Sequence, residues 1–196
     1  MSLSRSTRWP RPSARAALAA AGAVAVLLSG CARAVPAPSP SPSADAADPI
    51  FASDEEALAA AVEAYEAHLA IVDQLTAAGV ADTSQLDEVA SPSYARGLED
   101  SLQRLQESGT RTQGDTLFDN AGLVEKVEAD GVATVSVYLC LDVSGVRVID
   151  AAGADVTPPE RLNRAPIQVE FESSSVKAPA QLVVSGAQSW SGEDFC

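Results

Sequence analysis

The stretch VATVSVYLCLD, residues 132 to 142, has the period of two that is typical of a half-buried β-strand. Its aliphatic residues fall at every second position and therefore on one face. They are Val135, Val137, Leu139 and Leu141, while Tyr138, Cys140 and Asp142 fall on the other face. This pattern predicts a strand with one face toward a hydrophobic core.

The period of two extends to both sides of this strand. Asp130-Gly131 is a strong signal for a two-residue hairpin turn, which would pair residues 123 to 129 with the strand. Further strands are predicted at residues 115 to 119, around Ile167 to Phe171 and around Leu182 to Val184. The second half of the chain is therefore expected to form an antiparallel sheet.

Before residue 110 the pattern is helical. Ser53 and Glu56 form a capping box, and Gly79 is expected to end this first helix at about Ala78. An apolar stripe follows it at Leu58, Val62, Tyr65, Leu69, Val72 and Leu75. A short second helix is predicted at 82 to 90, and a third from Ser91-Pro92 to Gly109. Helices followed by strands predict an α+β fold, with amino-terminal helices packed on a curved antiparallel sheet.

The amino terminus indicates export. Residues 1 to 15 hold four arginines and no acid, and the apolar run from Ala16 to Leu28 is shorter than the roughly 20 residues of a membrane span. It ends in Leu28-Ser29-Gly30-Cys31, which resembles the lipobox of bacterial lipoproteins. The resemblance implies cleavage before Cys31, diacylglycerol on its thiol, and anchoring to the extracytoplasmic face of the cell membrane. An ordinary signal peptide is the alternative.

This interpretation divides the chain into three segments. Residues 1–30 are interpreted as a lipoprotein signal peptide, residues 31–48 as a disordered Pro/Ser/Ala tether, and residues 49–196 as one domain. With Cys31 lipidated, Cys140 and Cys196 remain as a pair in an oxidising compartment. We therefore expect them to form a disulfide.

The net charge of the chain limits the classes of partner that it can bind. After removal of the signal peptide, 27 acidic residues face nine basic ones, a formal charge of −18. Nucleic acid is excluded as a partner, because phosphate binding depends on clustered Lys and Arg. The expected partners are the membrane, through the lipid on Cys31, and an envelope protein or small ligand.

The order of elements, with one cysteine on a middle strand and one at the carboxyl end, resembles the NTF2-like (cystatin-like cone) domains of small actinobacterial lipoproteins. The resemblance covers about residues 50 to 196. It implies a cone whose mouth can hold a small molecule, and some relatives are isomerases or dehydratases that use Asp, Tyr or His inside the cavity.

Tyr65, His68, Tyr138 and Asp142 are the candidates for such a cavity. A raised pKa at Asp142 would suit a general base, but a solvent-facing strand end is the alternative. For His68 packing at the helix edge is the favoured interpretation, and for the tyrosines it is packing in the core. No spacing typical of a metal site or a cofactor motif is found in the sequence.

These observations favour a non-enzymatic binding or accessory module with no cofactor or metal. Two alternatives stay open: a small-molecule enzyme of the isomerase or dehydratase kind that uses the cone cavity, and a structural spacer or immunity-type partner that would expose a large apolar patch.

Overall fold

The computed structural model describes residues 48–80 and 82–196. The expected signal peptide, Cys31 and nearly all of the tether lie outside these residues. The elements are α1 (Asp54–Ala78), α2 (Leu86–Val89), α3 (Pro92–Ser108), β1 (Arg111–Gln113), β2 (Leu117–Ala129), β3 (Val132–Asp142), β4 (Arg147–Ile149), β5 (Arg164–Ser175) and β6 (Ala178–Ser189). Within the described residues, no helix is both long and apolar enough to cross a membrane.

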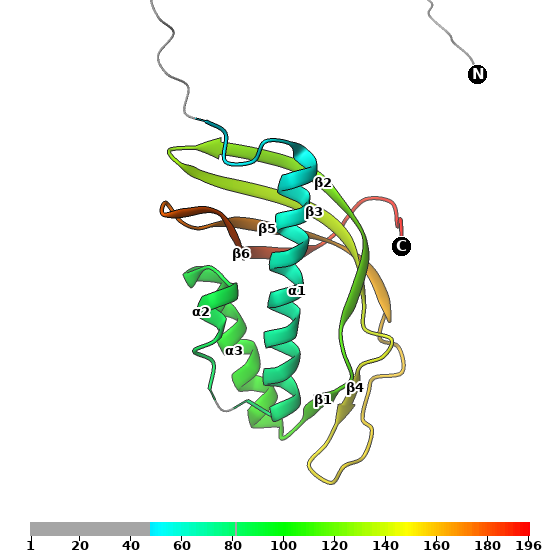
Figure 1. The fold of residues 1–196 in the computed structure, drawn as a ribbon. Helices are drawn as coiled ribbons and strands as arrows, with labels where there is room; N and C mark the ends of the chain where they lie inside the picture. Colours follow the sequence, from blue (N-terminus) through cyan, green and yellow to red (C-terminus); the bar gives the residue numbers. More distant parts are fainter. Residues whose placement is uncertain (1–47, 81) are drawn as a thin grey trace, which may run out of the picture. The chain divides into compact units, whose positions relative to one another are not determined.

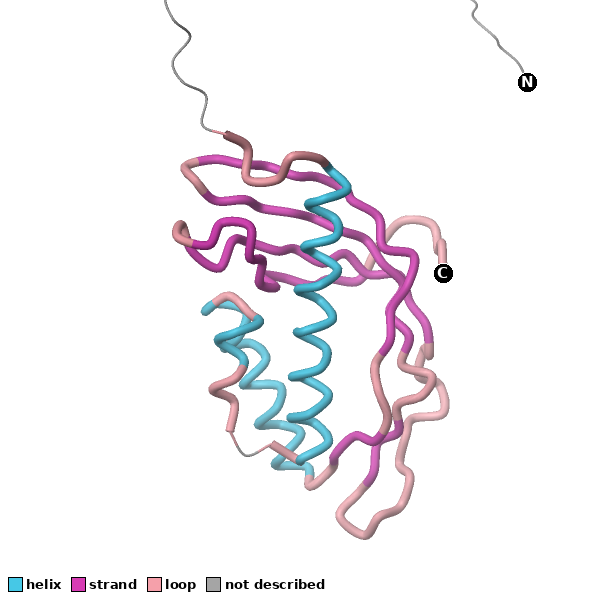
Figure 2. The backbone as a smooth tube through the Cα atoms, in the orientation of Figure 1, coloured by secondary structure: helices cyan, strands magenta, loops and turns pink. Residues whose placement is uncertain are grey.

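The fold is α+β, as predicted. Strands β2, β3, β5 and β6 form an antiparallel sheet in that order, and β1 pairs with β4 in a separate two-stranded sheet. The long strands bend, so that the larger sheet curves around α1 (Figure 1; Figure 2). The predicted hairpin is confirmed: Asp130 and Gly131, with φ of 53° and 78°, connect β2 to β3. Positive φ at both central residues is what a type I′ turn requires.

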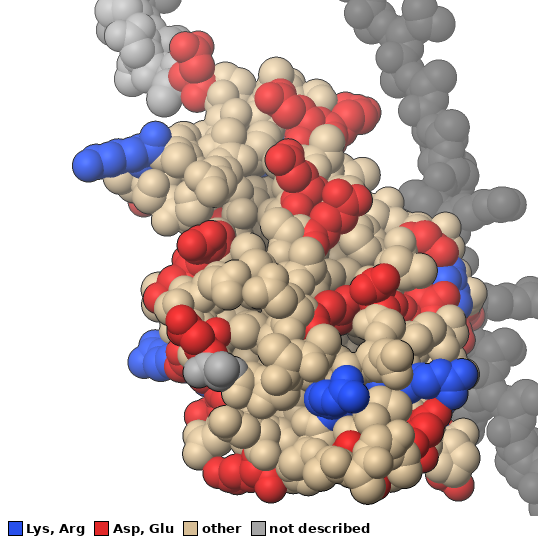
Figure 3. All heavy atoms as spheres, turned by 60° about the horizontal axis from the view of Figure 1, so that its bottom comes forward, with Lys and Arg blue, Asp and Glu red and all other residues tan. Residues whose placement is uncertain are grey.

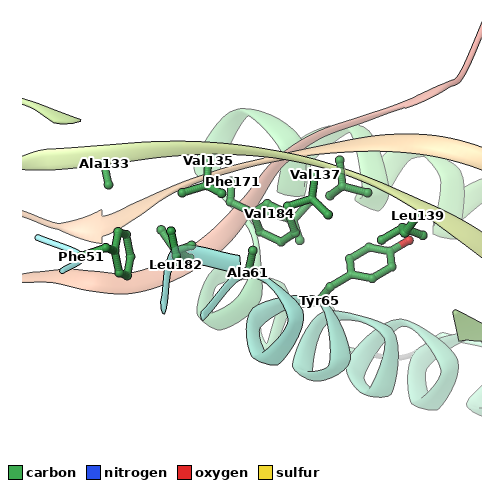
Figure 4. Packing of buried hydrophobic residues seen from close by; sticks show 12 residues of the cluster. Phe51, Ala61, Tyr65, Ala133, Val135, Val137, Leu139, Phe171, Leu182 and Val184 are labelled. Atoms are coloured by element: carbon green, nitrogen blue, oxygen red, sulfur yellow. The ribbon is translucent and has the colours of Figure 1, made fainter. Parts of the chain in front are cut away.

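Helix α1 lies close against the sheet because its contact face begins with alanines. Ala57 and Ala61 are 0% and 1% exposed, and Tyr65 follows one turn later. Figure 4 shows Ala61 and Tyr65 pointing at Val137, Leu139 and their neighbours on the sheet. The predicted stripe is confirmed at Tyr65 and Leu75, which are buried, whereas Leu58 and Leu69 flank the contact face and are only partly buried. Small side chains mark the contact because they allow the helix backbone to approach the strands.

The second half of α1 belongs to a different hydrophobic cluster. Leu75 packs there with residues of α2 and α3, among them Leu86 and Leu102. At the start of α3, the backbone amide of Ser91 donates to the carbonyl of Val184 on β6, at 2.8 Å. Helix α1 therefore packs on the sheet with its first half and on α2 and α3 with its second half.

The carboxyl terminus is attached to the sheet. Cys140 on β3 and Cys196 form the expected disulfide, with their Cα atoms 5.6 Å apart. Arg164 Nε also donates to the carbonyl of Cys196, at 3.2 Å. Cys140 is fully buried although it lies on the face opposite Leu139, because the terminal segment covers it.

Two local predictions differ from the structure, and two short strands were not predicted. The second helix is one turn, Leu86–Val89, and not 82 to 90. The strands predicted at 115 to 119 and at 123 to 129 form one strand, β2, which begins at Leu117 and ends at Ala129. Strands β1 and β4 were not predicted, because three residues are too few to show a period.

We expect the disulfide to contribute strongly to stability. Replacing both cysteines by alanine should lower the free energy of unfolding by about 2–5 kcal/mol, since the bridge closes a long loop in the unfolded chain. Urea unfolding of the two proteins measures this difference. A change below about 0.5 kcal/mol would show that the terminal segment is held by its other contacts alone.

Candidate functional site

Tyr65 and His68 lie in the packed interior and not at an open cavity. Both side chains belong to α1, are 4% exposed, and stack with ring centroids 5.8 Å apart. The Tyr65 ring also meets Phe118 and Phe171 edge-on. Burial raises the pKa of the Tyr65 hydroxyl far above its ordinary value, so the phenol stays neutral.

The imidazole of His68 is buried deeper than a helix-edge position would predict. The centroid of its ring lies 5.9 Å from that of Tyr94 on α3. Its Nδ1 has no hydrogen-bond partner among the residues that the structure describes. Burial lowers the pKa of His68 to about 4, and a hydrogen bond to the backbone of Val89 acts in the opposite direction. His68 is therefore neutral at pH 7 and acts as a packing group between the helices.

Tyr138 and Asp142 are on other surfaces. Tyr138 packs on the outer face of the sheet against Trp190 and Phe195, with ring centroids 6.3 and 5.1 Å away. Asp142 accepts a hydrogen bond from the Ser144 amide at 2.8 Å. The hydrogen bonds from Ser144, and then the charge of Arg164, lower the pKa of Asp142.

The pKa of Asp142 is thus shifted away from the raised value that a general base would need. The structure does not bring the four candidate residues together around one cavity. Among the described residues, no three His, Cys, Asp or Glu side chains are placed to hold a metal ion.

The structure instead contains a groove of about 680 Å³ between α1 and the chain segment that holds β1 and the start of β2. One wall is a stripe on the second half of α1, and the other is continuous from Arg111 to Phe118. The α1 wall consists of Glu66, Leu69, Ala70, Asp73, Gln74 and Ala77. Spacings of three and four place these six side chains on one helix face, along about 16 Å. A volume of this size is typical of pockets for small ligands.

Polar contacts connect the two walls of the groove. The carboxylate of Asp73 accepts from the Thr116 amide at 2.7 Å and from the Thr116 hydroxyl at 2.8 Å. One turn along α1, the hydroxyl of Thr112 donates to that of Thr76 at 2.7 Å. Because a carboxylate that takes both donors of one residue fixes that residue's position, the β1–β2 segment is held at a defined distance from the helix.

The Gly114 bend lies in the same wall. Its φ is 101°, and a Cβ there would collide with the carbonyl of Gly145. Only glycine fits this conformation without strain, so the bend that carries Asp115 and Thr116 toward α1 depends on it.

The groove combines apolar surface with negative charge. Leu69, Leu117 and Phe118 supply apolar surface, and Leu117 is 63% exposed. Of the described residues that line the groove, Glu66, Asp73 and Asp115 are acidic and Arg111 alone is basic. Figure 3 turns this end of the domain toward the viewer and shows acidic side chains spread over it, with basic ones in few places.

Sequence reasoning did not find this groove. Its two walls are separated by more than 30 residues, and each alone is an ordinary helix face or a short polar segment. The only sign of the α1 wall in the sequence was that small and polar residues between Glu66 and Ala77 fall on one face of the first helix, next to its apolar stripe. A face of that kind is equally typical of a solvent-exposed surface.

The comparisons with known proteins concern the fold. No family model matches the chain, and no curated protein matches it. Among solved structures, the chain is similar to the intermembrane space region of the chloroplast protein ARC6, with a TM-score of 0.50 and 14% sequence identity. The match covers 69% of this chain and 97% of that one. At this identity the likeness shows a shared fold alone.

His68 should make stability depend on pH. In the unfolded chain its pKa is near 6.5, and in the fold it is lowered to about 4, so protonation opposes folding. As pH falls from about 6.5 to 4, the protein should lose up to about 3 kcal/mol that a His68→Leu variant keeps. Urea unfolding of both proteins from pH 7 to 4 measures this. Parallel stability curves would show that the imidazole is not desolvated in solution.

Proposed function

We propose that this chain is a lipid-anchored protein of the extracytoplasmic face of the cell membrane, and that its domain is a non-enzymatic module which binds its ligand in the groove between α1 and residues 111–118. The observation that carries the binding role is the groove itself, with its 680 Å³ volume and walls connected by hydrogen bonds. Connected walls favour binding, because a preformed site loses little entropy when it is filled.

The finer class of the fold belongs to the same proposal. Helices before strands, and a long first helix across the concave face of a curved sheet, support an NTF2-like domain. In such a domain the cone cavity would lie between α1 and the sheet. Here Val137, Leu139 and Phe171 fill that space together with Tyr65 (Figure 4).

The filled interior bears on the alternative function. An isomerase or dehydratase that works inside the cone needs room for its substrate and a carboxylate or imidazole at the base. The space between α1 and the sheet is occupied by packed side chains, and the acidic candidate Asp142 lies at a strand end beside Ser144. These positions favour binding over catalysis.

The anchor is supported by the sequence from Leu28 to Cys31, behind its basic and apolar segments. We expect a Cys31→Ser variant to leave the membrane fraction and appear in the soluble extracytoplasmic fraction, since the lipid is the proposed attachment. Fractionation of cells with immunoblotting measures the distribution. Retention of the variant on the membrane, at the wild-type level, would contradict the anchor.

Occupancy of the groove can be measured in cells. A photoreactive benzophenone side chain at Gln113, an exposed residue of the groove wall, should give an adduct of discrete mass after irradiation. Ala70→Trp places a large ring in the groove and should abolish the adduct. Ala67→Trp is the matched control, because Ala67 is also exposed on α1 but does not line the groove.

Intact-mass spectrometry reads the result for a small ligand and for a protein partner alike. An adduct that survives Ala70→Trp, or no adduct in any variant, would contradict the groove as the binding site.

A further inference from the structure

The acidic side chains of the groove have no basic partner among the described residues. Glu66 and Asp115 are exposed and take part in no ion pair there, and Asp73 bonds the neutral Thr116. By contrast, the acids elsewhere that do pair use Lys126, Arg147 and Arg164. The groove therefore carries a net negative charge, because three acidic residues face the single basic residue Arg111 in its described lining.

Apolar surface lies beside this charge. Leu117 is 63% exposed at the groove, and Leu69, Ala70 and Phe118 continue the apolar lining. Apolar area removed from water by an occupant is worth roughly 25 cal/mol per Å² before the costs of binding. An occupant that matches both features has an apolar body and a positive charge.

The size and charge of the groove further limit the class of ligand that it can hold. Pockets of roughly 300–1,000 Å³ hold small molecules, and this groove is within that range at about 680 Å³. A second copy of the chain is a poor occupant, because it would bring a large surplus of acidic residues to an acidic groove. Anionic ligands are opposed for the same reason.

We propose that the groove binds a small organic cation, in which an apolar body lies on Leu69, Leu117 and Phe118 and an ammonium or guanidinium group is attracted by Glu66, Asp73 and Asp115. This inference rests on the proposed function, because it names the ligand class of the same groove. Arg111 has the opposite effect: its charge opposes the cation and limits affinity.

The test uses three probes with the same body and different charge, namely 4-phenylbutylamine, 4-phenylbutanol and 4-phenylbutyrate. Calorimetry or saturation-transfer NMR with the full chain should show that the ammonium probe binds about tenfold more tightly than the carboxylate, with the alcohol between them. Raising the salt concentration should reduce this preference, because the groove charges are exposed to solvent.

Variants of the groove residues test whether the preference for the ammonium probe arises in the groove. The double variant Glu66→Gln, Asp115→Asn should weaken binding of the ammonium probe by about fivefold and leave the alcohol unchanged, whereas Arg111→Gln should strengthen it by about twofold. Glu125→Gln removes an exposed acid on β2 outside the groove and should change neither. Asp73 is kept in all variants because it holds Thr116.

The outcomes separate this inference from the proposed function. Equal affinity for the three probes, or equal effects of the groove variants and Glu125→Gln, would overturn the cation proposal. If Ala70→Trp still weakened all three probes, the groove would remain the binding site. If no probe bound at all, the cation proposal would be contradicted, and the adduct at Gln113 would decide separately whether the groove is occupied in cells.

Discussion

The structure depends on one helix that serves two hydrophobic clusters. The first half of α1 approaches the curved sheet through Ala57 and Ala61, which are almost fully buried, and its second half packs on α2 and α3 around Leu75. A helix of 25 residues is about 37 Å long, which is enough to reach both layers. Where α1 has left the sheet, the side of the helix away from α2 and α3 faces residues 111–118, and the groove lies between them.

Two opposing effects explain why the groove stays open and why the distance between its walls is fixed. Collapse of residues 111–118 onto α1 would bury the charged side chains of Glu66 and Asp115, which is costly without partners. Separation would break the two hydrogen bonds that Thr116 donates to Asp73. The groove is therefore a balance between charge that must stay solvated and hydrogen bonds that limit the distance between the walls.

Much of the fold could be predicted from local patterns, because a half-buried strand and a capped helix each leave a period in the sequence. The alternation in residues 132–142 located β3, and Asp130-Gly131 located its turn. On the contact face of α1, Tyr65 was predicted, but Ala57 and Ala61 were missed because alanine carries little apolar signal, although its small size is what permits close packing. The pairing of Asp73 with Thr116 joins residues 43 positions apart, and no local period marks such a contact.

The contact between Asp73 and Thr116 gives the most direct test of this account. Hydrogen exchange measured by NMR reports the protection of the Thr116 amide. We predict that this amide is protected in the native chain and loses most of its protection in Asp73→Ala, while amides around Ala61 in the first half of α1 keep theirs. Asp115→Ala, which removes a neighbouring acid with no role in the contact, should leave Thr116 protected. An unprotected Thr116 amide in the native chain, or unchanged protection in Asp73→Ala, would contradict the account.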